Sequence, residues 1–116
     1  MIEDKDPLVF IKHILENIKD VEVFTRYISK EEFFENKEKQ NAVIRSIEVI
    51  GEAAKNLPDS FKDKYPEISW KDITGTRDKL IHYYFGVDLN AVWKVVKKNI
   101  PELKLQIEEI LKEESS

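Results

Sequence analysis

The stretch VIRSIEVIGEAAKNL, residues 43–57, decides the fold because its apolar side chains recur at the spacing of one helix face. They lie three and four residues apart and comprise Val43, Ile47, Ile50, Ala54 and Leu57, which we call the seam. This period predicts an amphipathic helix that buries one side in a core. The following Pro58 disfavours the helical conformation at Leu57, so we expect the helix to end there.

The same pattern predicts a helix before this seam. It runs from Pro7 to Ile28, and its apolar stripe consists of Leu8, Ile11, Ile14, Leu15, Ile18 and Val21. Ser29, with Glu32 three residues later, is a capping-box signature that opens a second segment.

A further helix is expected after the seam. Ser69, with Asp72 three residues on, caps its start, and the helical pattern runs to about Phe85, with Gly75 as a candidate kink. Gly86 is a natural stop.

Two more helices complete the chain. Asp88 is expected to cap one of them, with the stripe Leu89, Val92, Trp93 and Val96. Pro101 is expected to start the last helix. The inward face of that helix would carry Leu103, Ile107, Ile110 and Leu111. No stretch alternates as a strand does, so the sequence predicts an all-α fold. We expect an antiparallel bundle of four to five helices, with residues 1–116 as one domain.

Composition excludes several classes of protein. The 116 residues include no cysteine, which excludes disulfides, thiol catalysis and zinc–thiolate sites. No apolar run is long enough to span a membrane, and the charged start MIEDKD does not resemble a signal peptide. A cytoplasmic protein without membrane contact is therefore expected.

The charge of the chain is uneven. The net charge is −4, which argues against broad nucleic-acid binding, yet residues 71–104 hold seven basic and four acidic residues. This stretch is basic by three charges and is where a polyanion would bind. The alternative is an ordinary solvated surface on which the charges cluster by chance.

Arg77, His82 and Tyr84 carry the chemistry that this basic stretch offers, in the spacing Arg-x4-His-x-Tyr. An arginine is a permanent planar cation for phosphate, and a histidine exchanges a proton near neutral pH. The two groups suffice to cut RNA without a metal. Taken singly, each residue also has a structural reading: a salt-bridge arginine, a surface histidine and a core tyrosine. His13, opposite the stripe of the first helix, has no assigned role.

Helix geometry relates these residues to one another. On a regular helix, Arg77 shares an apolar face with Trp70, Ile73, Leu80, Ile81 and Tyr84, so it needs a carboxylate or phosphate partner. His82 lies ~140° around the helix from Arg77. Asp78, four residues before His82, can orient the imidazole and favour its charged form. Because one helix does not aim both groups at one point, we expect a composite site across a dimer axis.

The stretch from Ser69 to Asp88 closely resembles the HEPN superfamily and, within it, the HepT-like (DUF86) family. The likeness includes the Arg-x4-His-x-Tyr core, the polar Asp78 after the arginine, and the sequence YFGVD at residues 84–88. It extends upstream to the sequence IEVIGEAA at residues 47–54 and downstream to the sequence IPEL at residues 100–103. The resemblance covers nearly the whole chain.

The resemblance implies a HEPN-like helical bundle that forms a homodimer with facing motif helices. It implies a metal-independent endoribonuclease, the toxin of a type VII toxin–antitoxin system, with RNA as substrate and no metal or other cofactor. Arg77 and His82 would be catalytic, and Asp78 would support them. The antitoxin would be an MNT-type nucleotidyltransferase, which silences the toxin by adding AMP to the motif tyrosine, Tyr84.

Two readings stay open at this point. In the first, His82 is the general acid/base for attack of a 2′-hydroxyl on its own phosphate, and Arg77 stabilises the developing charge. In the second, the bundle is a non-catalytic, nucleotide-binding or accessory subunit of a nucleotidyltransferase, and Arg77 is a phosphate anchor.

Overall fold

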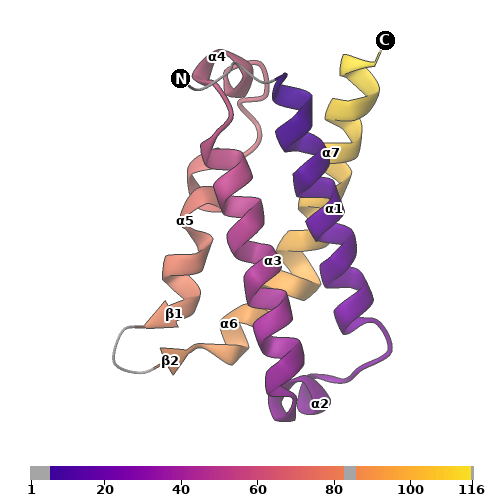
Figure 1. Cartoon of the computed structure of the whole chain (residues 1–116), viewed down its shortest axis with the longest axis vertical. Helices are drawn as coiled ribbons and strands as arrows, with labels where there is room; N and C mark the ends of the chain where they lie inside the picture. The colour runs from indigo at the N-terminus through magenta and orange to yellow at the C-terminus, as the bar shows by residue number, and fades with distance from the viewer. Residues whose placement is uncertain (1–5, 83–85, 116) are drawn as a thin grey trace.

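The computed structural model describes residues 6–82 and 86–115, and these form an all-α bundle (Figure 1). The α-helices span Pro7–Thr25 (α1), Lys30–Glu35 (α2), Lys37–Lys55 (α3), Asp59–Lys62 (α4), Trp70–Leu80 (α5), Leu89–Lys94 (α6) and Ile100–Glu114 (α7). A π-helical turn, Val95–Asn99 (η1), joins α6 to α7. Two short strands, Ile81–His82 (β1) and Gly86–Val87 (β2), follow α5.

The long helices pack against one another as a bundle, as the sequence predicts. Helix α3 lies between α1 and α5, and α7 packs on the other side of α1 (Figure 1). The predicted seam is buried, and each of its residues is at most 4% exposed. It joins a continuous core whose largest fully buried members include Phe33, Ile11, Ile14, Ile18, Leu80, Ile107 and Ile110. Apolar burial of this kind is the main stabilising contribution to such a bundle.

Two of the predicted helix caps, Ser29 and Asp88, are confirmed by hydrogen bonds. The Glu32 amide donates to Ser29 Oγ at 3.0 Å, and the Ser29 amide donates to Glu32 Oε1 at 2.8 Å, which is the capping box. The Asp88 carboxylate accepts from the Ala91 amide at 3.0 Å. Ser69 does occupy the N-cap of α5, but its side chain makes no capping hydrogen bond, so that part of the prediction is wrong.

Two predicted helix boundaries are also wrong. Helix α1 ends at Thr25 and not at Ile28, because Arg26 is extended and Tyr27 has φ +70°. The seam helix α3 ends at Lys55, two residues before Leu57. Pro101 lies in the first turn of α7, as predicted, although the chain is also helical before it, from α6 through η1. Proline suits that position because its missing amide hydrogen has no α-helical partner to lose there.

The largest correction concerns the helix that carries the motif. It was expected to reach Phe85, but α5 ends at Leu80 and the chain turns into a β-hairpin in which Ile81 pairs with Val87 and His82 with Gly86. Gly86 has φ +77°, a conformation that glycine adopts without strain. The Asp88 amide donates to the Leu80 carbonyl at 2.8 Å and closes the base of the hairpin. Gly75 does not interrupt α5, which is continuous through it.

The C-terminal end of α7 is tied to the loop before α5. The buried Tyr65 hydroxyl donates to Glu114 Oε2 at 2.5 Å, and Lys64 Nζ approaches the same oxygen at 2.7 Å. Burial, and then the adjacent carboxylate of Glu114, raise the pKa of Tyr65. The hydrogen bonds from Lys64 and Tyr65 lower the pKa of Glu114.

These pKa shifts predict how stability depends on pH. The protonated phenol of Tyr65 is favoured in the folded state, so its contribution is complete below pH ~10 and is lost as the pH rises above that value. The ionised carboxylate of Glu114 is favoured, so its contribution is lost as the pH falls below ~4.3. Urea unfolding at a series of alkaline pH values should show a steeper loss of stability for the wild type than for Tyr65→Phe. Parallel curves for the two proteins would contradict the assignment.

Candidate active site

Helix α5 presents Arg77 to helix α3. The Arg77 Nε donates to Glu48 Oε2 at 2.7 Å, and the two residues lie 29 positions apart in the sequence. The Arg77 side chain is half exposed and that of Glu48 is 31% exposed, so the arginine is neither buried nor unpaired. Of the two partners expected for Arg77, the structure contains the carboxylate. Since a guanidinium has five N–H donors, this bond leaves others for a second anion.

The close approach of α3 and α5 depends on a glycine. A Cβ atom at Gly51 would lie 3.3 Å from the backbone oxygens of both Ile73 and Thr74. These oxygens belong to the helix backbone and have little freedom to move. The absence of a side chain at Gly51 therefore lets α5 lie close enough to α3 for Arg77 to reach Glu48.

Enlarging Gly51 is expected to separate the two helices. Gly51→Leu should lower the free energy of unfolding by about 1–3 kcal/mol, the usual cost of overpacking. Urea denaturation measures this cost. The matched control is Gly75→Ala in α5, where a Cβ meets no atom within 4 Å and alanine should stabilise the helix by roughly 0.5–1 kcal/mol. A Gly51→Leu protein as stable as the wild type would contradict the packing argument.

Asp78 also lies beside Arg77. Its Oδ1 is 3.6 Å from Arg77 Nη1, and its side chain is 86% exposed. Such an exposed ion pair contributes little to stability. The predicted alignment of Asp78 under His82 assumed four residues of continuous helix, and α5 ends two residues after Asp78. That geometric argument is therefore wrong.

His82 lies in β1, directly after α5, and its backbone pairs with that of Gly86. The expected angle of ~140° between Arg77 and His82 was calculated for a helix and does not apply to a strand. Tyr84 lies outside the described residues, and its predicted place on the helix face of Arg77 loses its basis in the same way.

An open pocket borders Arg77 on the side that faces α1 and α3. Its lining includes Phe10, Glu48, Thr74 and Arg77. His13, which the sequence left without a role, is exposed on α1 and also borders this pocket. The pocket thus holds a paired but accessible arginine with room beside it, a geometry suited to binding a phosphate group.

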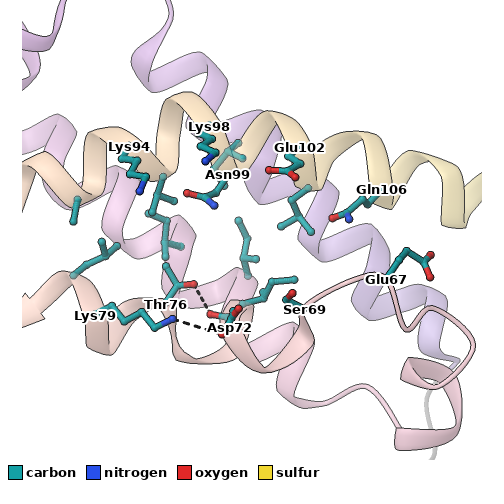
Figure 2. A pocket seen from close by; sticks show the side chains of 18 residues that line it. Glu67, Ser69, Asp72, Thr76, Lys79, Lys94, Lys98, Asn99, Glu102 and Gln106 are labelled. Atoms are coloured by element: carbon teal, nitrogen blue, oxygen red, sulfur yellow. Dashed lines mark hydrogen bonds and ion pairs between the residues drawn. The ribbon is translucent and has the colours of Figure 1, made fainter.

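A second groove lies on the opposite side of α5, between that helix and the continuous helix of α6, η1 and α7 (Figure 2). Its volume is about 510 Å³, and its apolar lining is Ile47, Ile50, Ile73, Leu80, Ala91, Val95, Ile100 and Leu103. Lys79, Lys94 and Lys98 stand on its rim. Sequence reasoning found the basic character of this stretch but not the groove.

The described residues contain no group of three or more histidine, aspartate or glutamate side chains that could hold a metal ion. Within the same residues, no helix has the length and apolar character needed to cross a membrane.

Glu48 is the residue at this site that the sequence reasoning missed. It lies inside the sequence IEVIGEAA that suggested the family, and Arg77 was expected to need an anionic partner. The partner could not be chosen from the sequence, because several carboxylates of the seam helix and its neighbours were equally available.

Comparison with known proteins finds that the sequence of this chain is similar to those of proteins named as ribonucleases. The family model described as ribonuclease HepT-like matches residues 14–110. A protein of Methanocaldococcus jannaschii named "Putative RNase MJ0127" is 49% identical over 94% of this chain and 90% of its own length. A "Probable ribonuclease HepT" of Thermococcus cleftensis is 50% identical over 89% of this chain and 94% of its own.

A third relative is longer. The Methanocaldococcus jannaschii protein named "Gamma-glutamylcyclotransferase and putative RNase MJ0434" is 50% identical over 94% of this chain, which matches 49% of that protein. No solved structure matches the chain.

Proposed function

This chain belongs to the ribonuclease HepT-like family, and we propose that it is itself a metal-independent endoribonuclease with RNA as its substrate. One observation carries the proposal. Arg77 is paired yet half exposed at an open pocket, on the helix that leads directly into the His82 hairpin. A cation for phosphate in α5 and a residue able to transfer a proton in the β1 strand that follows it are thus close together along the chain.

In the proposed reaction, His82 takes the proton of a ribose 2′-hydroxyl, whose oxygen then attacks the neighbouring phosphorus. Arg77 stabilises the negative charge that develops on the phosphate oxygens. The bond from phosphorus to the 5′-oxygen breaks, and that oxygen takes up the proton that His82 accepted, directly or through water, so the histidine returns to its starting form. The products are a 2′,3′-cyclic phosphate and a 5′-hydroxyl, and every step is a proton or phosphoryl transfer that needs no metal.

We propose Glu48 as a positioning residue for Arg77. Its 2.7 Å bond to Nε fixes the plane of the guanidinium and leaves the Nη groups for the phosphate. Asp78 is proposed to support the site as the polar residue directly after the arginine. Its support is now the family resemblance and its 3.6 Å approach to Arg77 Nη1, and no longer the helix spacing.

We further propose a homodimer that brings two copies of the motif into one cleft. The angular argument for it was lost when α5 proved to end at Leu80. What supports it is the family resemblance, together with the exposure of α5, in which Arg77, Asp78 and Lys79 are all exposed. Monomers by light scattering at micromolar concentration would count against the dimer.

The biological setting is proposed from the family resemblance alone. The chain would be a single domain, a cytoplasmic toxin of a type VII toxin–antitoxin pair. Its partner would be an MNT-type nucleotidyltransferase that attaches AMP to Tyr84.

The alternative is a non-catalytic, nucleotide-binding or accessory subunit of a nucleotidyltransferase, which the Arg77–Glu48 ion pair also permits. The experiment that separates the two is RNA cleavage by the purified chain. An enzyme cuts RNA alone and loses that activity with His82→Ala, whereas an accessory subunit binds its partner and leaves RNA intact.

A further inference from the structure

We propose that the groove between α5 and the α6–η1–α7 helix binds a nucleotide of single-stranded RNA that flanks the cleavage point. This inference rests on the proposed function for its substrate and assigns that substrate a second contact surface. The groove lies on the side of α5 opposite to Arg77, so it is distinct from the pocket described above.

The size and lining of the groove suit one nucleotide. Its volume of about 510 Å³ falls within the usual range of small-molecule sites, roughly 300–1,000 Å³. The apolar side chains of α3, α5, η1 and α7 form its floor and offer a surface for a nucleobase. Thr76, Asn99 and Gln106 line the groove with hydroxyl and amide groups that can bond to a base or a ribose (Figure 2).

The groove owes part of its form to the π-helical turn η1. The Ile100 amide donates to the Val95 carbonyl, five residues back, so this turn is wider than an α-helical one. Val95, Lys98 and Asn99, all in or at the end of η1, line the groove. Such turns within α-helices are frequently found at functional sites.

The two ends of the groove differ in charge. Lys79, Lys94 and Lys98 lie toward one end, whereas Glu67, Glu102 and Gln106 lie toward the other (Figure 2). Lys79 Nζ lies 3.6 Å from Asp72 Oδ1, but Lys94 and Lys98 form no ion pair within the described part of the chain. A phosphate is therefore attracted to the basic end and repelled from the carboxylates.

The basic end is also the end nearer the motif. Lys79 and Leu80 line the groove, and Leu80 is followed directly by β1 and the backbone of His82. An RNA strand with one phosphate on Lys94 and Lys98 would therefore continue toward the hairpin. An acidic protein segment could bind the same lysines, but a groove with an apolar floor and amide groups beside those lysines favours a nucleotide.

The test is binding of a fluorescent, 2′-O-methylated RNA of about six nucleotides, within the usual range for single-strand sites. Methylation removes the attacking hydroxyl, so binding is measured without cleavage. The variant Lys94→Glu/Lys98→Glu should weaken binding by roughly tenfold or more by fluorescence anisotropy. Lys94→Gln/Lys98→Gln should lower the slope of log Kd against log salt by about 0.7, since ~0.7 is lost per phosphate contact on single strands and the two lysines hold one phosphate.

The matched control is Lys12→Glu/Lys19→Glu, which makes the same charge change on the exposed surface of α1. It should change the affinity much less, and Lys94→Arg/Lys98→Arg should restore binding. Equal weakening by the control, or wild-type affinity in the groove variant, would overturn the inference. So would an unchanged affinity for RNA together with lost binding to a partner protein.

The outcome is separable from that of the proposed function. RNA cleavage with no effect of the groove variants would remove only the groove as a binding site. RNA binding that depends on Lys94 and Lys98, without any cleavage by the wild type, would support the groove and contradict the nuclease.

Discussion

Replacing His82 by alanine is expected to lower the rate of RNA cleavage by roughly 10²-fold or more, because proton transfer by a positioned group contributes at least that much. Arg77→Ala should cause a loss of similar size through the phosphate charge that it no longer stabilises. Rates are measured on a defined RNA under single-turnover conditions. Both proteins should keep their helical circular dichroism, since Arg77 is half exposed and its ion pair adds little to stability.

Two further variants sharpen this test. Arg26→Ala removes an arginine from the exposed connection after α1, away from the site, and should leave cleavage unchanged. Glu48→Gln should reduce cleavage less than Arg77→Ala, because the amide oxygen can still accept from Nε while losing its charge. Full activity of Arg77→Ala would contradict the role of the arginine, and equal losses in Arg26→Ala would indicate a general effect of charge.

Tyr84→Phe is expected to escape silencing by the nucleotidyltransferase almost completely, while keeping RNA cleavage. The change removes only the hydroxyl that would carry AMP. Attached AMP would bring a negative phosphate close to the cation that the RNA phosphate needs, and its adenosine would obstruct the site. The measurement is residual RNA cleavage after incubation with the cognate nucleotidyltransferase and ATP, with the added mass located by peptide mass spectrometry.

Tyr83 provides the internal control for this prediction. Tyr83→Phe should be silenced as the wild type is, with the added mass on Tyr84. Added mass on Tyr83 alone, or complete silencing with neither tyrosine modified, would contradict the proposal. Because Tyr84 lies outside the described residues, this prediction depends on the family resemblance and on its position two residues after His82.

Local signals in the sequence predicted most of the bundle. The seam of α3 is buried as its period required, because a helix with one apolar face has to cover that face. The capping residues Ser29 and Asp88 act through hydrogen bonds within three residues, so they too could be recognised without tertiary information. The pairing of Trp93 with Phe33, whose ring centroids are 5.3 Å apart, agrees with its place on an apolar stripe.

The motif region could not be predicted in the same way. A helix-period argument treats every residue as helical, but residues 81–85 are isoleucine, histidine and three aromatics, most of which favour extended structure. Gly86 then lets the chain reverse. The Arg77–Glu48 bond joins residues far apart in the sequence and depends on the contact at Gly51, so it required the packed structure.

Cleavage of RNA by the purified wild-type chain in excess EDTA decides whether this chain is a metal-independent nuclease. We predict the same cleavage with and without the chelator, and fragments that end in a 2′,3′-cyclic phosphate and begin with a 5′-hydroxyl. An RNA with a single 2′-deoxyribose at the cut position should resist cleavage there, because it lacks the attacking oxygen. Cleavage that requires added magnesium, or that proceeds at the deoxyribose, would contradict the mechanism, and intact RNA under all conditions would favour the accessory subunit.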